Sequence, residues 1–134
     1  MKLIVSLILI SLLLSGCGLI STPVYRSGGI SASGAVAGFR ARGVASYYGS
    51  GFHGNLTANG ETFDMNAMTC AHLTLPFDTV LRVTNLDNNR QVTVRVNDRG
   101  PYVGGRVIDL SKAAAEELGM LESGIANVLL NVIN

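Results

Sequence analysis

The chain has 134 residues, of which 48% are hydrophobic and 14% charged, so it has room for one modest folded domain. The formal net charge is +1, and loss of a leader containing Lys2 would leave nine basic residues against nine acidic ones. This balance excludes the strongly basic class of nucleic-acid-binding proteins and is compatible with a neutral polymer, such as a glycan, as partner.

The N-terminus has the pattern of a secretory leader. Lys2 is followed by an apolar run over residues 3–14, which is too short for a membrane-spanning helix of roughly 20 residues. The segment 14–17, with sequence LSGC, resembles the lipobox of bacterial lipoproteins. That resemblance implies removal of residues 1–16 as a signal peptide and lipidation of Cys17 with acyl chains of the palmitate type. The alternative is an ordinary leader with an incidental cysteine.

Several acyl chains on one residue would anchor the protein stably to a membrane. Gly18 follows the cysteine, and in the lipoprotein sorting pattern that this resembles, glycine at that position carries no retention signal. We therefore expect the mature protein to be lipid-anchored to the inner leaflet of the outer membrane, facing the periplasm.

Residues 17–42 are predicted to comprise the lipidated cysteine and a flexible tether. They are rich in Ser, Gly and Ala, contain Pro23 and show no lasting apolar period. About 24 such residues have a typical reach on the order of 25 to 30 Å, which spaces a domain from a membrane. The folded domain is then expected over residues 43–134.

Short strands separated by turns are predicted along that domain. Asn59-Gly60 is the strongest turn signal in the chain and places Glu61 directly after a turn. One helix is expected over residues 112–118, with Ser111 as N-cap and Gly119 as stop. Many short strands, abundant glycine and one helix favour a mainly β fold, a small β-barrel. The expected strands are residues 44–48, 79–85, 91–97, 106–110 and 126–133, of which the second and third form a hairpin.

The stretch Val92–Pro101 is the centre of the predicted domain. Its valines alternate with polar residues, as in a strand with one buried face, and Gly100-Pro101 then interrupts regular pairing. Asp98 is thereby placed at a rigid strand end beside a loop, where scaffolds often present reactive groups. The alternative is a turn aspartate that accepts hydrogen bonds from the amides of Arg99 and Gly100.

Cys70 has no partner in the chain if Cys17 is acylated, so no internal disulfide is expected. A buried structural thiol is the favoured interpretation. The alternative is a thiolate activated by His72, which shares a face with Cys70 only in a strand.

Seven motifs together resemble the RlpA family of rare lipoproteins. The resemblance covers essentially all of residues 43–134 in the right order, and it does not extend to the glycan-binding SPOR domain that many members carry at the C-terminus. The motifs are ASYYG (45–49), FHG (52–54), TANGE (57–61), AHLTLP (71–76), VTNL (83–86), VRVNDRGP (94–101) and IDLS (108–111).

This resemblance implies a six-stranded double-psi β-barrel with one or two short helices. It also implies a periplasmic, endolytic lytic transglycosylase, a lyase that cuts peptidoglycan between N-acetylmuramic acid and N-acetylglucosamine and leaves 1,6-anhydro ends. The catalytic residues that it implies are Asp98, Glu61 and His72, and it implies no cofactor and no metal. A metal site built from His53, Asp64 and His72 has no supporting ligand spacing.

The proposed chemistry needs only one carboxyl group, because the C6 hydroxyl of the muramic acid is the nucleophile. The hypothesis is that Asp98 protonates the glycosidic oxygen and then takes the proton of that hydroxyl. This requires the pKa of Asp98 to lie above that of a free aspartate, so Arg99 is expected to turn away from it. Glu61 and His72 are expected to contact substrate or tune the site; alone, they would be a solvated glutamate and a structural histidine.

Substrate contacts are expected from residues around these three. Tyr48 and Phe52 are candidates for stacking on sugar faces, although burial in the core is the alternative. The further candidates for substrate binding are His53, Thr57, Asn59, Asn97 and Arg99.

The expected partners are peptidoglycan glycan strands and a membrane, the latter through Cys17. Cell-division or wall proteins are further possible partners, for which no residue marks a site. The alternative function is a non-catalytic, expansin-like module that binds peptidoglycan without cleaving it.

Overall fold

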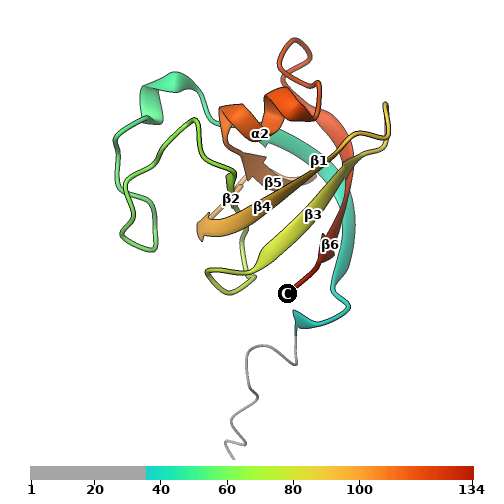
Figure 1. Cartoon of the computed structure of the whole chain (residues 1–134), viewed down its shortest axis with the longest axis horizontal. Coiled ribbons are helices and arrows are strands. Elements are labelled where there is room, and N and C mark those ends of the chain that lie inside the picture. Colours follow the sequence, from blue (N-terminus) through green and yellow to red (C-terminus); the bar gives the residue numbers. More distant parts are fainter. Residues whose placement is uncertain (1–35) are drawn as a thin grey trace, which may run out of the picture.

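The computed structural model describes residues 36–134, so the predicted leader, the lipidation site at Cys17 and most of the tether lie outside the described residues. Six strands close into a barrel in the order β1-β5-β2-β4-β3-β6, as the expected six-stranded fold requires (Figure 1). The strands are β1 (Arg40–Tyr47), β2 (Thr69–Ala71), β3 (Val80–Asn85), β4 (Gln91–Asp98), β5 (Arg106–Leu110) and β6 (Ala126–Val132).

One short α-helix, α2 (Lys112–Glu117), and one 3₁₀ turn, η1 (Ser50–Phe52), accompany the strands of the described region. The Ser111 side chain accepts a hydrogen bond from the Ala114 amide, which makes it the predicted N-cap. The helix ends before Gly119, whose φ of +68° favours glycine. Within residues 36–134, every helix is too short or too polar to cross a bilayer.

The barrel mixes parallel and antiparallel pairing. β1 pairs in parallel with β5, and β2 pairs in parallel with β4, whereas β3 and β4 form the predicted antiparallel hairpin. Consecutive strands β1 and β2 are not neighbours, and their connection, residues 48–68, extends from one side of the barrel (Figure 1). The β4 arrow ends on that same side, so the long connection and the end of β4 lie near each other.

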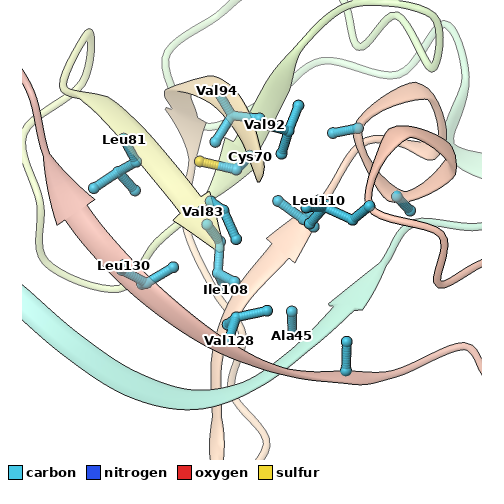
Figure 2. Packing of buried hydrophobic residues seen from close by; sticks show 14 of the residues in the cluster. Ala45, Cys70, Leu81, Val83, Val92, Val94, Ile108, Leu110, Val128 and Leu130 are labelled. Atoms are coloured by element: carbon cyan, nitrogen blue, oxygen red, sulfur yellow. The ribbon is translucent and has the colours of Figure 1, made fainter. Parts of the chain in front are cut away.

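The barrel interior is filled by aliphatic side chains. Val92, Val94 and Val96 all point inward, as their alternation predicted, and all are buried. The Cys70 side chain is fully buried in the same cluster, among the aliphatic residues labelled in Figure 2. The favoured interpretation of Cys70 as a buried structural thiol therefore agrees with the fold, and the described part of the chain contains it as a free cysteine.

The start of the barrel differs from the predicted boundary at residue 43. β1 begins at Arg40, and its pairing with β6 starts there, with Arg40 opposite Asn131. Val36 and Phe39 also pack against the core. Residues 36–42 are therefore part of the folded domain rather than tether, because the length of β1 is set by its β6 partner, which sequence composition does not reveal.

Candidate active site

A β-bulge turns Asp98 to the outer face of the barrel wall. Cys70 pairs with Val96, but the next residue of β2, Ala71, pairs with Asp98, so Asn97 is an extra residue on β4. If side chains had alternated strictly along β4, Asp98 would have pointed inward as Val96 does. The extra residue instead brings Asp98 to the side on which Ala71 lies, as bulges beside functional sites often do.

The Asp98 carboxylate accepts three hydrogen bonds. Its Oδ1 accepts from the backbone amides of Ala58 and Arg99, each at 2.9 Å. Its Oδ2 accepts from the Tyr48 hydroxyl at 2.8 Å. The bond from the Arg99 amide is the one expected of a turn aspartate, whereas those from Tyr48 and Ala58 join Asp98 to the β1–β2 connection and fix the orientation of its carboxylate.

Tyr48 reaches Asp98 across the outer face of the barrel. Its ring packs edge-on against Phe63, with centroids 4.9 Å apart, and lies 5.7 Å from the ring of Phe52. Burial, followed by the hydrogen bond to Asp98, raises the pKa of Tyr48 far above its ordinary value. Tyr48 therefore remains a hydrogen-bond donor, and its ring is half-buried rather than fully open for stacking.

Glu61 is held as an anion on the outer face of β4. Its two oxygens accept from the Arg95 guanidinium at 2.6 and 2.9 Å, and Asn59 and Asn97 donate to it as well. The Arg95 hydrogen bonds, with those of Asn97 and Asn59, lower the pKa of Glu61 to about 2. Glu61 is thus a poor proton donor near neutral pH, and its bonds tie the 57–61 turn to β4.

His72 follows β2 and is positioned through its backbone and one ring nitrogen. Its amide donates to the Asp98 carbonyl oxygen at 3.2 Å, and Nδ1 accepts from the amides of Thr74 and Leu75. Since Nδ1 accepts two bonds, the ring proton belongs on Nε2. Burial, and then the charge of Arg99, lowers the pKa of His72, which favours the neutral ring. Nε2 has no partner among residues 36–134 and is not sealed from solvent.

Arg99 turns away from Asp98, as expected. Its guanidinium donates to the carbonyl oxygens of His72 and Leu75, at 3.2 and 2.9 Å, and lies 4.0 Å from the centroid of the Phe77 ring. These contacts hold the start of the β4–β5 loop against the β2–β3 connection.

The other predicted substrate-binding residues lie in two settings. Phe52 is 54% exposed on η1, open to a ligand, and His53 is exposed with its Nδ1 accepting from the Met65 amide. Thr57 and Asn97 are buried, and Asn59 accepts from the Thr57 hydroxyl at 2.6 Å. Thr57, Asn59 and Asn97 therefore mainly hold the turn that carries Glu61, and they leave little exposed surface for a ligand.

Two groups that the sequence interpretation did not single out lie beside this cluster. Asp109 on β5 pairs with Ala71, which in turn pairs with Asp98. Tyr102, in the β4–β5 loop, is 81% exposed and lies next to Gly100. Asp109 lies in the IDLS motif, which could have indicated it as a site residue, whereas Tyr102 belongs to none of the motifs.

Across residues 36–134, no three His, Cys, Asp or Glu side chains converge as metal ligands. The cluster around Asp98 is instead a set of carboxylates, amides and aromatic rings. Such a set suits proton transfer to and from a polar substrate with apolar faces, such as a glycan.

Comparison with protein families agrees with this chemistry. A family described as "Lytic transglycolase" matches residues 40–130. A Campylobacter jejuni protein named endolytic peptidoglycan transglycosylase RlpA is 64% identical over 96 residues, which are 72% of this chain and 35% of that protein. A Vibrio cholerae protein of the same name is 55% identical over 96 residues, 72% of this chain and 36% of that protein. The chain thus spans about a third of the length of these curated relatives.

Solved structures resemble the barrel at low sequence identity. The Streptomyces papain inhibitor aligns with a TM-score of 0.59 and 23% identity, over 73% of this chain and 97% of that one. A Clavibacter michiganensis expansin aligns with a TM-score of 0.57 and 22% identity, over 72% of this chain and 51% of that one. With the closed six-stranded topology, these matches confirm the double-psi β-barrel as the fold.

Proposed function

The chain belongs to the lytic transglycolase family of double-psi β-barrels represented by the RlpA proteins, and on that premise we propose that it cleaves the glycan strands of peptidoglycan. The bond cleaved is that between N-acetylmuramic acid and N-acetylglucosamine, with formation of a 1,6-anhydro end. The observation that carries the proposal is the outward Asp98 carboxylate, oriented by three donors, one of which is Tyr48, whose ring lies 5.7 Å from the exposed ring of Phe52.

The hydrogen bonds of Asp98 indicate which oxygen exchanges protons with the substrate. A carboxylate oxygen has two acceptor positions, and the amides of Ala58 and Arg99 occupy both positions of Oδ1. Oδ2 accepts only from Tyr48, which leaves one position for a catalytic proton. In the proposed reaction, Oδ2 gives this proton to the glycosidic oxygen as the bond to the anomeric carbon breaks. The substrate C6 hydroxyl then bonds to that carbon and returns its proton to Oδ2.

Glu61 and His72 have different proposed tasks. Glu61 is a positioning residue, because its ion pair with Arg95 holds the turn whose Ala58 amide binds Asp98. The His72 side chain is largely buried, with 7% of the residue exposed, but its Nε2–H has no partner among residues 36–134 and is suited to donate to a sugar oxygen or to an acetamido carbonyl. Neither residue is required to exchange a proton in this scheme.

The proposal is tested with the full chain, intact peptidoglycan sacculi and peptide-free glycan strands, followed by mass analysis of the new ends. We expect 1,6-anhydro ends from the wild-type chain. Asp98→Asn, which is nearly isosteric, should lower their release at least about 100-fold, the typical contribution of a positioned acid–base group. Asp87→Asn, in the exposed β3–β4 turn, is the matched control and should leave release unchanged.

Other products would contradict the proposal in distinct ways. Reducing ends that carry a water-derived oxygen would indicate a hydrolase. Retained glycan binding without any new ends would indicate the non-catalytic, expansin-like wall-binding module. An equal loss in Glu61→Gln and Asp98→Asn would favour a mechanism with two carboxylates.

Attachment to the outer membrane through Cys17 is also part of the proposed function. It is supported by the apolar leader and the LSGC segment, and it would hold the barrel at the periplasmic face, within reach of peptidoglycan. Cells grown with labelled palmitate should incorporate label into the wild-type chain and not into Cys17→Ser. Label in both chains would exclude Cys17 as the acylated residue.

A further inference from the structure

Two aspartates lie in one row across the outer wall of the barrel. Ser46 on β1 pairs with Asp109 on β5, Asp109 pairs with Ala71 on β2, and Ala71 pairs with Asp98 on β4. Residues that are paired across strands project from the same face of a sheet. Asp109 and Asp98 are therefore on the same face and two strands apart, about 10 Å between their Cα atoms.

The side chain of Asp109 is held in place on one oxygen only. Its Oδ1 accepts a hydrogen bond from the Ser46 hydroxyl and lies 3.9 Å from Nη1 of Arg106. The same Arg106 nitrogen donates to the Ser46 oxygen at 3.1 Å. These groups orient the carboxylate, and the side chain is only 16% exposed, so its interactions with nearby groups are weakly screened by solvent.

The second oxygen of Asp109 faces the Asp98 side of the site. A Cβ atom built on Gly100, two residues after Asp98, would lie 3.9 Å from Oδ2 of Asp109 and 3.8 Å from the Tyr102 ring. Oδ2 has no hydrogen-bond partner within residues 36–134, yet it is not sealed from solvent. An oriented, unpartnered carboxylate oxygen thus lies near Gly100, the position that the exposed Tyr102 ring also approaches.

We propose that Asp109 is a second catalytic residue, whose anionic carboxylate stabilises the positive charge that develops on the muramic acid ring during cleavage. This inference rests on the proposed function and deepens it. An oxocarbenium-like charge forms at the anomeric carbon and ring oxygen as the glycosidic bond breaks. A preoriented anion on the same face as the proton donor lowers the energy of that state.

Asp109 forms no covalent bond in this scheme and exchanges no proton. Asp98 supplies the proton to the leaving oxygen, the C6 hydroxyl oxygen bonds to the anomeric carbon, and the hydroxyl proton returns to Asp98. The positive charge thus appears and disappears on the substrate, without proton transfer to or from Asp109.

The test separates charge stabilisation from proton donation by means of two ligands and two substrates, with the full chain. The ligands are a glycan strand that ends in an ordinary, uncharged sugar ring and the same strand ending in a protonated iminosugar, which mimics the charged ring. The substrates are native glycan and a muramic acid glycoside with an aryl leaving group, which departs without help from an acid. The variants are Asp109→Asn, Asp98→Asn and, as control, Asp87→Asn.

We expect Asp109→Asn to bind the strand with the uncharged terminal ring within about threefold of wild type and to lose at least about tenfold of the preference for the iminosugar strand. Its cleavage rate should fall about 100- to 1,000-fold, the usual cost of removing one preorganised electrostatic group, on both substrates. Asp98→Asn should recover activity on the aryl glycoside. Recovery in Asp109→Asn, or an unchanged iminosugar preference, would overturn the assignment.

Failure of the proposed function would look different. A wild-type chain that forms no anhydro ends, but prefers the iminosugar strand through Asp109, would refute the cleavage and retain the charge contact. A wild-type chain without that preference would refute the contact itself.

Should Asp109→Asn fail to fold, Ser46→Ala carries the test, since loss of the hydroxyl leaves the charge of Asp109 but no longer fixes the orientation of its carboxylate. We expect about a tenfold loss of cleavage in Ser46→Ala, and an unchanged rate would overturn the assignment.

Discussion

Two consecutive tyrosines at the end of β1 have different partners, although they look interchangeable in the sequence. The Tyr47 hydroxyl donates to the carbonyl oxygen of Leu121, within the scaffold, and its ring packs against the core. The Tyr48 hydroxyl donates to Oδ2 of Asp98. Successive side chains of an extended segment point to opposite faces, so only the second tyrosine reaches the outer wall.

Replacement of each tyrosine by phenylalanine should therefore separate activity from stability. Tyr48→Phe removes one of the three bonds that orient Asp98, and we expect roughly a tenfold lower rate of anhydro-end formation, with glycan affinity retained. Tyr47→Phe is the control, with a loss of about 1 kcal/mol in the free energy of unfolding and an unchanged rate. Rates of release and denaturant unfolding of both variants check this. Equal effects on rate would mean that Tyr48 does not act through Asp98.

The ion pair of Glu61 with Arg95 predicts a pH dependence of stability. The pKa of Glu61 falls from an ordinary 4.5 to about 2 in the folded chain. A lowered folded-state pKa means that the ionised group stabilises the fold above pH 4.5 and that this contribution is lost as the pH falls towards 2. We expect Glu61→Gln to lower Tm at pH 6 and the difference from wild type to vanish near pH 2.

Thermal unfolding between pH 2 and 7 measures this difference. Glu122→Gln serves as control, because Glu122 is exposed and makes no ion pair with any described residue. Glu61 is already ionised throughout the physiological pH range, so its titration does not contribute to the pH dependence of the cleavage rate near neutral pH. That pH dependence should therefore be the same in Glu61→Gln as in wild type. A constant Tm difference down to pH 2 would show that the Arg95 pair does not depress the Glu61 pKa.

At the scale of elements, the strands could be predicted from sequence more fully than the site could. The alternation Val92–Val96 and the Asn59-Gly60 turn are local signals, and both appear where they were expected. The bulge at Asn97 is not local, because it is defined by a register shift against β2, whose paired residues Cys70 and Ala71 lie 26 and 27 positions before Val96 and Asp98. The outward direction of Asp98 could not be derived from periodicity, and neither could its place on the same face as Asp109 of β5. Both depend on the pairing of β2 with β4 and with β5.

The 57–61 turn is the element that connects Glu61 to Asp98, and a single glycine tests its role. Gly60 has φ of +88°, and a Cβ built there meets no atom within 4 Å, so Gly60→Ala costs only backbone strain, about 1 kcal/mol. We expect this strain to displace the Ala58 amide from Asp98 and to lower the cleavage rate several-fold.

Gly124→Ala is the matched control for that element. Gly124 has φ of +74° and the same open surroundings, but it lies in the turn before β6. Both variants should lose a similar amount of stability in denaturant unfolding, and only Gly60→Ala should lose activity. A similar loss of activity in both would mean that the global fold, rather than the turn, limits catalysis.

At the scale of the whole molecule, closure of the barrel isolates its interior from the candidate site on its outer face. β6 pairs with both β1 and β3, which leaves no open sheet edge between the first and last strands. The residues of the candidate site lie on the outer face or in the loops, whereas Cys70, the residue before Ala71, lies inside. A one-residue step along β2 therefore separates the outer face that carries the candidate site from the core.

This separation predicts that the Cys70 thiol reacts only when the barrel unfolds. The thiol is fully buried, and that burial raises its pKa well above the ordinary value, so folded chains should contain almost no accessible thiolate. In a Cys17→Ser chain, where Cys70 is the only cysteine, modification by a thiol reagent should be at least about 1,000-fold slower than in denaturant. Its rate should rise with denaturant in parallel with global unfolding measured by circular dichroism, because we expect only global unfolding to expose the core. Rapid modification under native conditions would instead support a thiolate activated by His72, and would mean that the wall at β2 opens without unfolding of the barrel.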